Sequence, residues 1–214
     1  MPSPTERTRL RRYPARGSHD RAVADAVLDE GLVCHVGFVS EGQPYVIPTA
    51  YAREGDAVFL HGSAVSRMLR HLRGGLPVCV TVTLLDGLVL ARSSFHNSMN
   101  YRSVVVLGVA QAVEAREPKL AALRVISEHL APGRWQVERA PSEQELAATL
   151  VLRLPIEEFS VKRRSGPPLD DPGDVERPIW AGVVPLRLQA GAPVADALTA
   201  SSLAPWLPPS TSGH

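Results

Sequence analysis

The sequence lacks the features that mark several common protein classes. Its 214 residues include only two cysteines, Cys34 and Cys79, and they fit no CxxC or zinc-ligand spacing. No apolar run approaches the length needed to span a membrane, and the N-terminus has no apolar signal segment. We therefore predict a cytoplasmic protein in which the two thiols are free and buried.

Sequence motifs of several enzyme classes are also absent. The chain has no GxxxxGK[ST] phosphate loop and no GxGxxG dinucleotide motif. It has no GxSxG nucleophile elbow and no HExxH, and its seven histidines form no metal-ligand set. These absences argue against P-loop, serine-triad and metal-dependent chemistry.

The overall charge is nearly balanced, with a net charge of +1 and a pI near 7.9. Such a balance gives no general attraction to nucleic acid or membrane surfaces. Five arginines cluster in residues 1–17, but so short a basic run is more typical of a lead-in segment than of a nucleic-acid-binding arm. We predict neither nucleic acid nor a membrane as a partner.

Short apolar segments separated by turn residues dominate residues 18–188. Turn signals every eight to twelve residues favour a mainly β (α+β) fold, an antiparallel barrel with flanking helices. The continuously apolar run Val104–Leu107 predicts a strand that is buried on both faces. Residues 189–214, rich in proline, serine and alanine, are expected to be an irregular tail.

The stretch Leu60–Leu72 combines the end of a strand, a glycine turn and a short amphipathic helix. Ser63 stands where an N-cap is expected, which places Ser66 and Arg67 in the first helical turn. Free amides, a hydroxyl and a guanidinium at one helix start are suited to bind phosphate. The alternative is an ordinary serine cap followed by a solvated arginine.

A second polar stretch, Ser94–Ser103, precedes the long apolar strand. It gathers serines, amides, a histidine, a tyrosine and an arginine within ten residues. Such a set of donors needs either a ligand or a well-satisfied network of turn hydrogen bonds, and the sequence leaves both possibilities open.

These stretches and several others resemble one family, the pyridoxamine 5′-phosphate oxidase-like, FMN-binding split-barrel proteins, and within it the nitroimidazole-resistance (Nim-type) branch. The resemblance runs in order over residues 6–188. The matching segments are Cys34–Phe38, Ile47–Thr49, Leu60–Leu72, Ser98–Val104, Pro132–Trp135 and Ile179–Gly182.

The resemblance implies an antiparallel split barrel that forms a homodimer with two FMN molecules at the subunit interface. By position, Ser66 and Arg67 would bind the FMN phosphate, as the helix start also suggests. The remaining positions that the resemblance places at FMN are Ile47, Pro48, Thr49 and Ala50 along the isoalloxazine edge, Leu60 and His61 beside the ring, and Arg102 and Ser103 on the long strand.

The sequence departs from the oxidases of the family at two places. The classical enzymes have Arg-Lys where this chain has Ser66-Arg67, so its phosphate site has one cation fewer. The C-terminal arginine and histidine that those oxidases use for pyridoxamine phosphate have no match here. We therefore do not expect the oxidation of a vitamin B6 compound.

His61 has two possible roles. It could stand over the flavin as the catalytic residue and hydrogen-bond or protonate a small substrate. It could instead be a strand-end histidine that only packs against the ring.

Three functions remain open at this stage. The first is an FMN-dependent oxidoreductase that passes hydride or electrons from a small-molecule donor to a small acceptor. The second is a flavin carrier or sensor without turnover. The third is a split barrel that binds haem in the same cleft.

Overall fold

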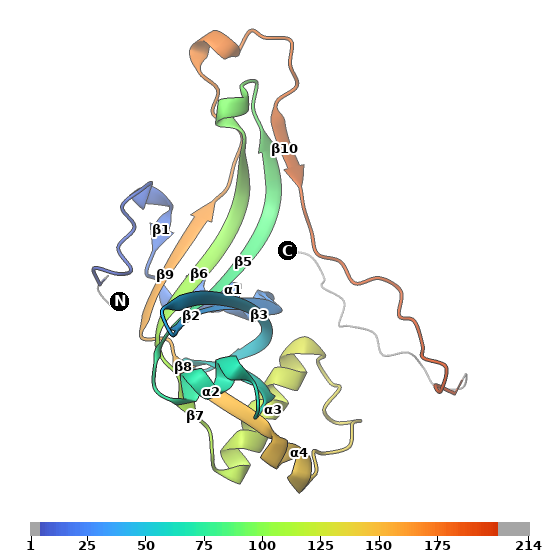
Figure 1. The fold of residues 1–214 in the computed structure, drawn as a ribbon. Coiled ribbons are helices and arrows are strands. Elements are labelled where there is room, and N and C mark those ends of the chain that lie inside the picture. The colour runs from blue at the N-terminus through green and yellow to red at the C-terminus, as the bar shows by residue number, and fades with distance from the viewer. Residues whose placement is uncertain (1–4, 201–214) are drawn as a thin grey trace.

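A curled antiparallel sheet forms the frame of the molecule (Figure 1). The computed structural model describes residues 5–200. The main path of the sheet runs β1-β9-β6-β5-β2-β3-β4-β8-β7, and β10 pairs with β5. The strands are β1 Gly17–Ser18, β2 Val33–Ser40, β3 Gln43–Glu54, β4 Ala57–Ser63, β5 Pro77–Leu90, β6 Ser98–Val109, β7 Gln111–Ala112, β8 Thr149–Pro155, β9 Glu158–Arg164 and β10 Gly182–Pro185.

In the part of the chain that the structure describes, four α-helices flank the sheet: α1 Arg21–Glu30, α2 Arg67–Arg73, α3 Arg116–Leu130 and α4 Glu143–Ala148. Helix α1 packs against β3, β5, β6 and β9, and α3 packs mainly against β3. Short 3-10 turns occupy Pro14–Arg16, Ser94–His96 and Pro172–Asp174. The predicted mainly β split barrel with flanking helices is confirmed.

Within residues 5–200, no helix is both long and apolar enough to cross a membrane.

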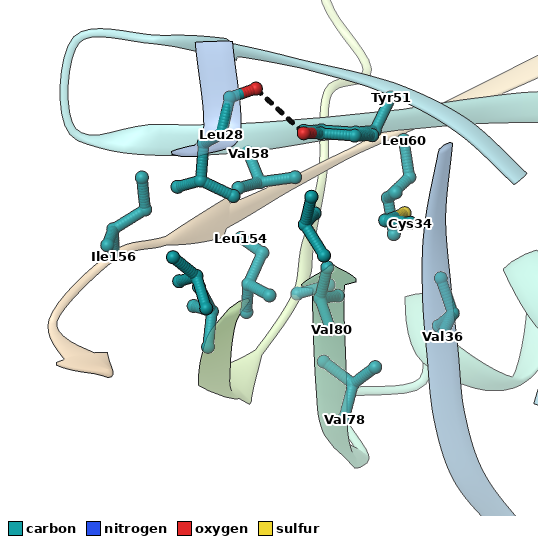
Figure 2. Close-up of a cluster of buried hydrophobic side chains, with 14 of the residues drawn as sticks. Leu28, Cys34, Val36, Tyr51, Val58, Leu60, Val78, Val80, Leu154 and Ile156 are labelled. Atoms are coloured by element: carbon teal, nitrogen blue, oxygen red, sulfur yellow. Dashed lines mark hydrogen bonds between the residues drawn. The ribbon is translucent and has the colours of Figure 1, made fainter. Parts of the chain in front are cut away.

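Strand alternation divides the sheet into a buried inner face and an open outer face. On β2, Cys34, Val36 and Phe38 point inward and are buried, while the residues between them are at least partly exposed. Figure 2 shows Cys34 and Val36 in a cluster that also includes residues from β4, β5 and β8. Burial in this core raises the pKa of the Cys34 thiol to about 12.

Two expectations about burial are wrong. The run Val104–Leu107 is not buried on both faces, because Val104 and Val106 enter the core while Val105 and Leu107 reach the outer face. Cys79 likewise alternates outward from β5 and is only half-buried, although both cysteines are free as predicted. In both cases the sequence is apolar enough for a strand that is buried on both sides, but these residues of the outer face are only partly buried.

Tyr51 ties α1 to the sheet. Its ring is fully buried, and its hydroxyl donates to the Leu28 carbonyl at 2.7 Å (Figure 2). That carbonyl lies in the last turn of α1, where helix carbonyls lack intrahelical partners. The chain leaves the helix through Gly31, where a Cβ would lie 2.8 Å from the tyrosine oxygen and 2.5 Å from Val82 Cγ1. The contact therefore needs glycine at this turn.

The far ends of β5 and β6 stand clear of the rest of the sheet, with β10 beside β5 (Figure 1). Strand β10 is shorter than the final strand expected from Trp180 to Leu188. Residues 186–200 contain neither helix nor strand. The rest of the expected irregular tail, from residue 201, lies outside the described residues.

We predict that Tyr51→Phe lowers the free energy of unfolding by about 1–3 kcal/mol, because the Leu28 carbonyl would stay buried without its donor. Urea denaturation measures the change. Tyr13→Phe, which removes the hydroxyl of an exposed tyrosine, is the matched control and should shift stability by less than about 0.5 kcal/mol. Equal effects of the two changes would show that the hydrogen bond contributes nothing.

Candidate functional site

The start of α2 differs from the sequence prediction. Ser66, not Ser63, is the N-cap, and its hydroxyl accepts from the Leu69 amide at 3.4 Å. The prediction fails because residues 63–66 form a turn of their own, closed by the Ser66 amide on the Ser63 carbonyl at 2.9 Å. Helical geometry therefore begins only at Arg67, and Val65 is exposed before the helix instead of belonging to its apolar stripe.

Arg67 carries a positive charge that no carboxylate within the described residues neutralises. Its guanidinium lies over the Tyr45 ring, 4.9 Å from the centroid, and Tyr45 in turn stacks on Phe38 at 5.4 Å. Arg70, one turn later on α2, also forms no ion pair within residues 5–200. The predicted anion site thus keeps two free cations, with Arg67 held in place by an aromatic ring.

His61 lies on β4 opposite Val151 of β8. Its Nδ1 is buried and has no hydrogen-bond partner in the described chain. Burial lowers the pKa of its imidazole, which is therefore neutral at pH 7. An unpaired buried nitrogen is costly, so this ring is suited to a partner that the chain does not supply.

Four other histidines within residues 5–200 differ in the state of Nε2. In His19, His96 and His129 this atom lies 3.2, 3.0 and 2.7 Å from an oxygen of the chain. His71 resembles His61 in having a buried nitrogen, Nε2, without a partner in residues 5–200. No group of three or more His, Cys, Asp or Glu side chains within that range is arranged to hold a metal ion.

The remaining candidate flavin residues on β3 and β4 point in different directions. Ile47 and Thr49 lie on the core side of β3, whereas Pro48 and Ala50 alternate to its outer face. Leu60 is 0% exposed, backbone included, so no part of it is open to a cofactor. Leu60 therefore positions its neighbour His61 and does not offer a contact surface of its own.

Arg102 is already neutralised within the protomer. Its guanidinium binds Asp86 at 2.7 Å and also pairs with Glu30, and these two carboxylates raise its pKa. Its neighbour Ser103 points to the outer face, where its hydroxyl donates to the Lys162 carbonyl at 3.2 Å. Of this pair, Ser103 lies on the outer face, while Arg102 lies on the opposite face, where its charge is already paired.

The candidate residues do not converge within one protomer. Ser103 on β6 is separated from β3 by β5 and β2, which places the two strands about 14 Å apart at the usual strand spacing. Ser66 and Arg67 lie beyond β3, beside Tyr45. The residues predicted for the phosphate and the residue predicted on the long strand therefore lie in separate parts of one chain.

The polar stretch Ser94–Ser103 is largely satisfied by its own surroundings. Asn97 Oδ1 accepts from the Ala91 amide at 2.8 Å, and Asn100 Nδ2 donates to the Gly166 carbonyl at 3.2 Å. His96 lies 3.0 Å from Asp171. Of the two possibilities that the sequence left open, the structure supports the turn network.

Sequence reasoning missed the outer face of the four central strands. Its positions, taken by alternation, include no Asp, Glu, Lys or Arg, although a fifth of the chain is charged. Formal charges appear only at the rim strand β9, with Glu158 and Lys162. The face consists of Val33, His35, Gly37, Val39, Pro44, Val46, Pro48, Ala50, Pro77, Cys79, Thr81, Thr83, Ser103, Val105, Leu107 and Val109.

Comparison with known families gives one match. Residues 20–163 match the sequence model of the pyridoxamine 5′-phosphate oxidase family. No curated protein matches the chain.

Solved structures resemble the chain over more of its length. The flavocytochrome Anf3 from Azotobacter vinelandii is 40% identical with a TM-score of 0.89, and the match covers 95% of each chain. The FAD and heme binding protein from Mycobacterium smegmatis is 39% identical with a TM-score of 0.86, covering 91% of this chain and 94% of that one. A candidate 5-nitroimidazole antibiotic resistance protein from Bacteroides thetaiotaomicron is 25% identical with a TM-score of 0.57, covering 68% and 85%.

We predict that His61 makes stability depend on pH. Because folding disfavours its protonated form, the unfolded chain binds the proton more readily once the pH falls below the ordinary pKa of 6.5. Stability should therefore decrease from pH 7.5 to pH 5.5, and it should decrease less in His61→Gln. Urea denaturation of both proteins across this range measures the slopes, and parallel slopes would contradict the assignment.

Proposed function

This chain belongs to the pyridoxamine 5′-phosphate oxidase family, and from that premise we propose that it is a redox protein that binds both a flavin and a haem. The observation that carries the proposal is the likeness, at about two-fifths identity and over nearly the whole chain, to a flavocytochrome and to a FAD and heme binding protein. Electron transfer between a small-molecule donor and a small acceptor is the activity that these cofactors serve.

The flavin we propose is FAD, with the FMN expected from the sequence as the alternative. Arg67 and Arg70 together present two unneutralised cations one turn apart, which suits a diphosphate better than the single cation expected from the sequence. The amides at the start of α2 add donors for the phosphate oxygens. In this assignment Arg67 binds the phosphate while Tyr45 fixes the plane of its guanidinium.

The residues present also fit a haem, since imidazole is its common axial ligand. Three histidines, His35, His61 and His71, have an Nε2 that forms no hydrogen bond with any group of residues 5–200. His61 fits best, because burial keeps its ring neutral and an iron ligand must be unprotonated. A bound haem would supply one-electron chemistry.

His61 is also the residue that we propose to act on the acceptor if the haem lies elsewhere. A neutral imidazole beside the flavin can hydrogen-bond an acceptor, although the depressed pKa makes it a poor store of protons at pH 7. Its role would then be mainly to orient the acceptor.

The flavin carrier without turnover remains the second candidate, supported by the absence of an ionised acid beside His61 in the described chain.

The assembly we propose is a homodimer in which each flavin touches both chains. The uncharged outer face supports it, because an open apolar sheet face of this extent is unusual for a monomer. The scattered candidate residues support it as well. Pro48, Ala50 and Ser103 lie on that face, so a two-fold partner can bring them near the Arg67 of the other chain.

The purified protein tests the cofactor proposal. We expect flavin absorption near about 450 nm together with a Soret band, and release of FAD on denaturation, identified by mass spectrometry. If the released flavin is FMN and not FAD, the proposed flavin site stands and the identity of its ligand changes to FMN. A protein that takes up neither flavin nor haem on reconstitution would contradict the proposal.

We predict that Arg67→Ala weakens the binding of FAD by about 1.5–3 kcal/mol, the usual contribution of hydrogen bonds to a charged group. Riboflavin, which lacks phosphate, should bind almost equally well to both proteins. Arg124→Ala on α3 removes another exposed arginine and is the matched control. Isothermal titration measures the constants, and equal losses for FAD and riboflavin would exclude Arg67 from the phosphate site.

A further inference from the structure

The far part of the β5–β6 hairpin forms an arm with residues 164–188 (Figure 1). The arm is a built structure. Arg92 binds Asp170 through its backbone amide at 2.7 Å and through its guanidinium at 2.8 Å, and the Asp170 side chain is only 5% exposed. The Leu186 amide donates to the Asp86 carbonyl at 3.0 Å, which fixes the end of β10.

The outer face of the sheet continues without interruption onto the arm. A register shift between Leu85 and Gly87 inserts one extra residue into β5. Because side chains alternate along a strand, this bulge moves Leu88 and Leu90 onto the same face as Leu85. Met99 on β6 pairs with Leu88 on this face, and Val184 on β10 pairs with it from the other side. All five side chains are at least one-third exposed.

Trp180 adds an aromatic ring to this face. Its indole lies against Gly182, where a Cβ would come within 2.9 Å of Trp180 Cζ2. Because Gly182 has no side chain, the ring can lie over its backbone, and it stays 65% exposed there. Tryptophan is one of the residue types most often found as the anchor of a protein interface.

We propose that the outer face of the arm docks on a second copy of this chain, with Trp180 as its anchor. The proposal rests on the homodimer proposed above and extends its interface beyond the barrel. The arm would lie across the partner's sheet, so that each chain holds the other.

Three features favour a second copy as the occupant. The arm continues, on the same strands β5 and β6, the uncharged face proposed as the dimer interface. The outer-face positions of β5, β6 and β10 in the arm carry no charged side chain, so pairing with an identical face creates no like-charge repulsion. A stable interface takes about 20–30 residues a side. Four positions on each of β2, β3, β5 and β6 in the body fall short of that range, and the arm brings the face into it.

The arm also extends beyond the part of the chain that defines the family. The family match ends at residue 163, before the segment that completes the arm. The flavocytochrome structure at 40% identity matches 95% of the chain, so its match includes most of that segment. The segment that completes the arm is therefore matched in that protein and is not particular to this chain.

Sedimentation velocity of the holoprotein over a range of concentrations tests the proposal. Met99→Glu and Trp180→Glu each place a carboxylate on the arm, and we expect the dimer dissociation constant to rise about 30- to 1,000-fold, the range for loss of an interface anchor. Val137→Glu, at a 73% exposed valine between α3 and α4, is the matched control and should leave the constant unchanged.

Hydrogen exchange of the wild type provides a second measurement that needs no variant. Amides in residues 85–101 and 179–186 should lose protection when the protein is diluted below its dissociation constant. Arm variants that dimerise like the wild type, with no change of exchange on dilution, would overturn the arm proposal and leave the homodimer standing. A wild-type protein that is monomeric at all concentrations would overturn both, whatever cofactors it binds.

Discussion

The alternation of side chains along β2, β3, β5 and β6 is the constraint on which the structure depends. One face of these strands buries the core, and Tyr51 fastens α1 over it through the Leu28 carbonyl. Alternation then obliges every second residue to point the other way, where no charged residue occurs on the four strands. The bulge shifts the alternation of β5 by one residue, and apolar side chains therefore stay on the outer face as the strands pass into the arm. A sheet with a solvent-exposed outer face would normally carry charged side chains there, and this is why we propose that the face pairs with a second chain.

The same geometry explains why the candidate site is divided. Arg67 stands over Tyr45 at the start of α2, while Ser103 lies about three strand spacings away on the outer face. Arg102, next to Ser103, points to the opposite face and is held by Asp86 and Glu30, where it serves the fold more than a ligand. A two-fold partner would bring residues from both groups to one flavin, and the unpaired nitrogen of His61 would then find a neighbour outside its own chain.

Much of the fold follows from the sequence, because strands, turns and amphipathic helices leave local patterns. The sequence Ser142-x-x-Glu145 has the spacing of a capping box, and both hydrogen bonds of the box are present. Ser63 misleads because residues 63–66 form a turn before the helix begins, so that Ser66 becomes the cap. The exposure of Val105 and Leu107 could not be predicted, since an apolar residue looks the same whether its own chain or a partner covers it. The arm has no local pattern, because the tie between Arg92 and Asp170 joins residues far apart in sequence.

The central claim is that the uncharged face pairs two chains and that the pairing completes the flavin site. The most direct test is flavin affinity in a monomer made by Val39→Asp, a change on the outer face at a residue outside the candidate flavin set. Sedimentation should show a monomer, circular dichroism should show an intact fold, and FAD should bind at least about 10-fold more weakly than to the wild type. A folded monomer that binds FAD as tightly as the wild-type protein would contradict the account.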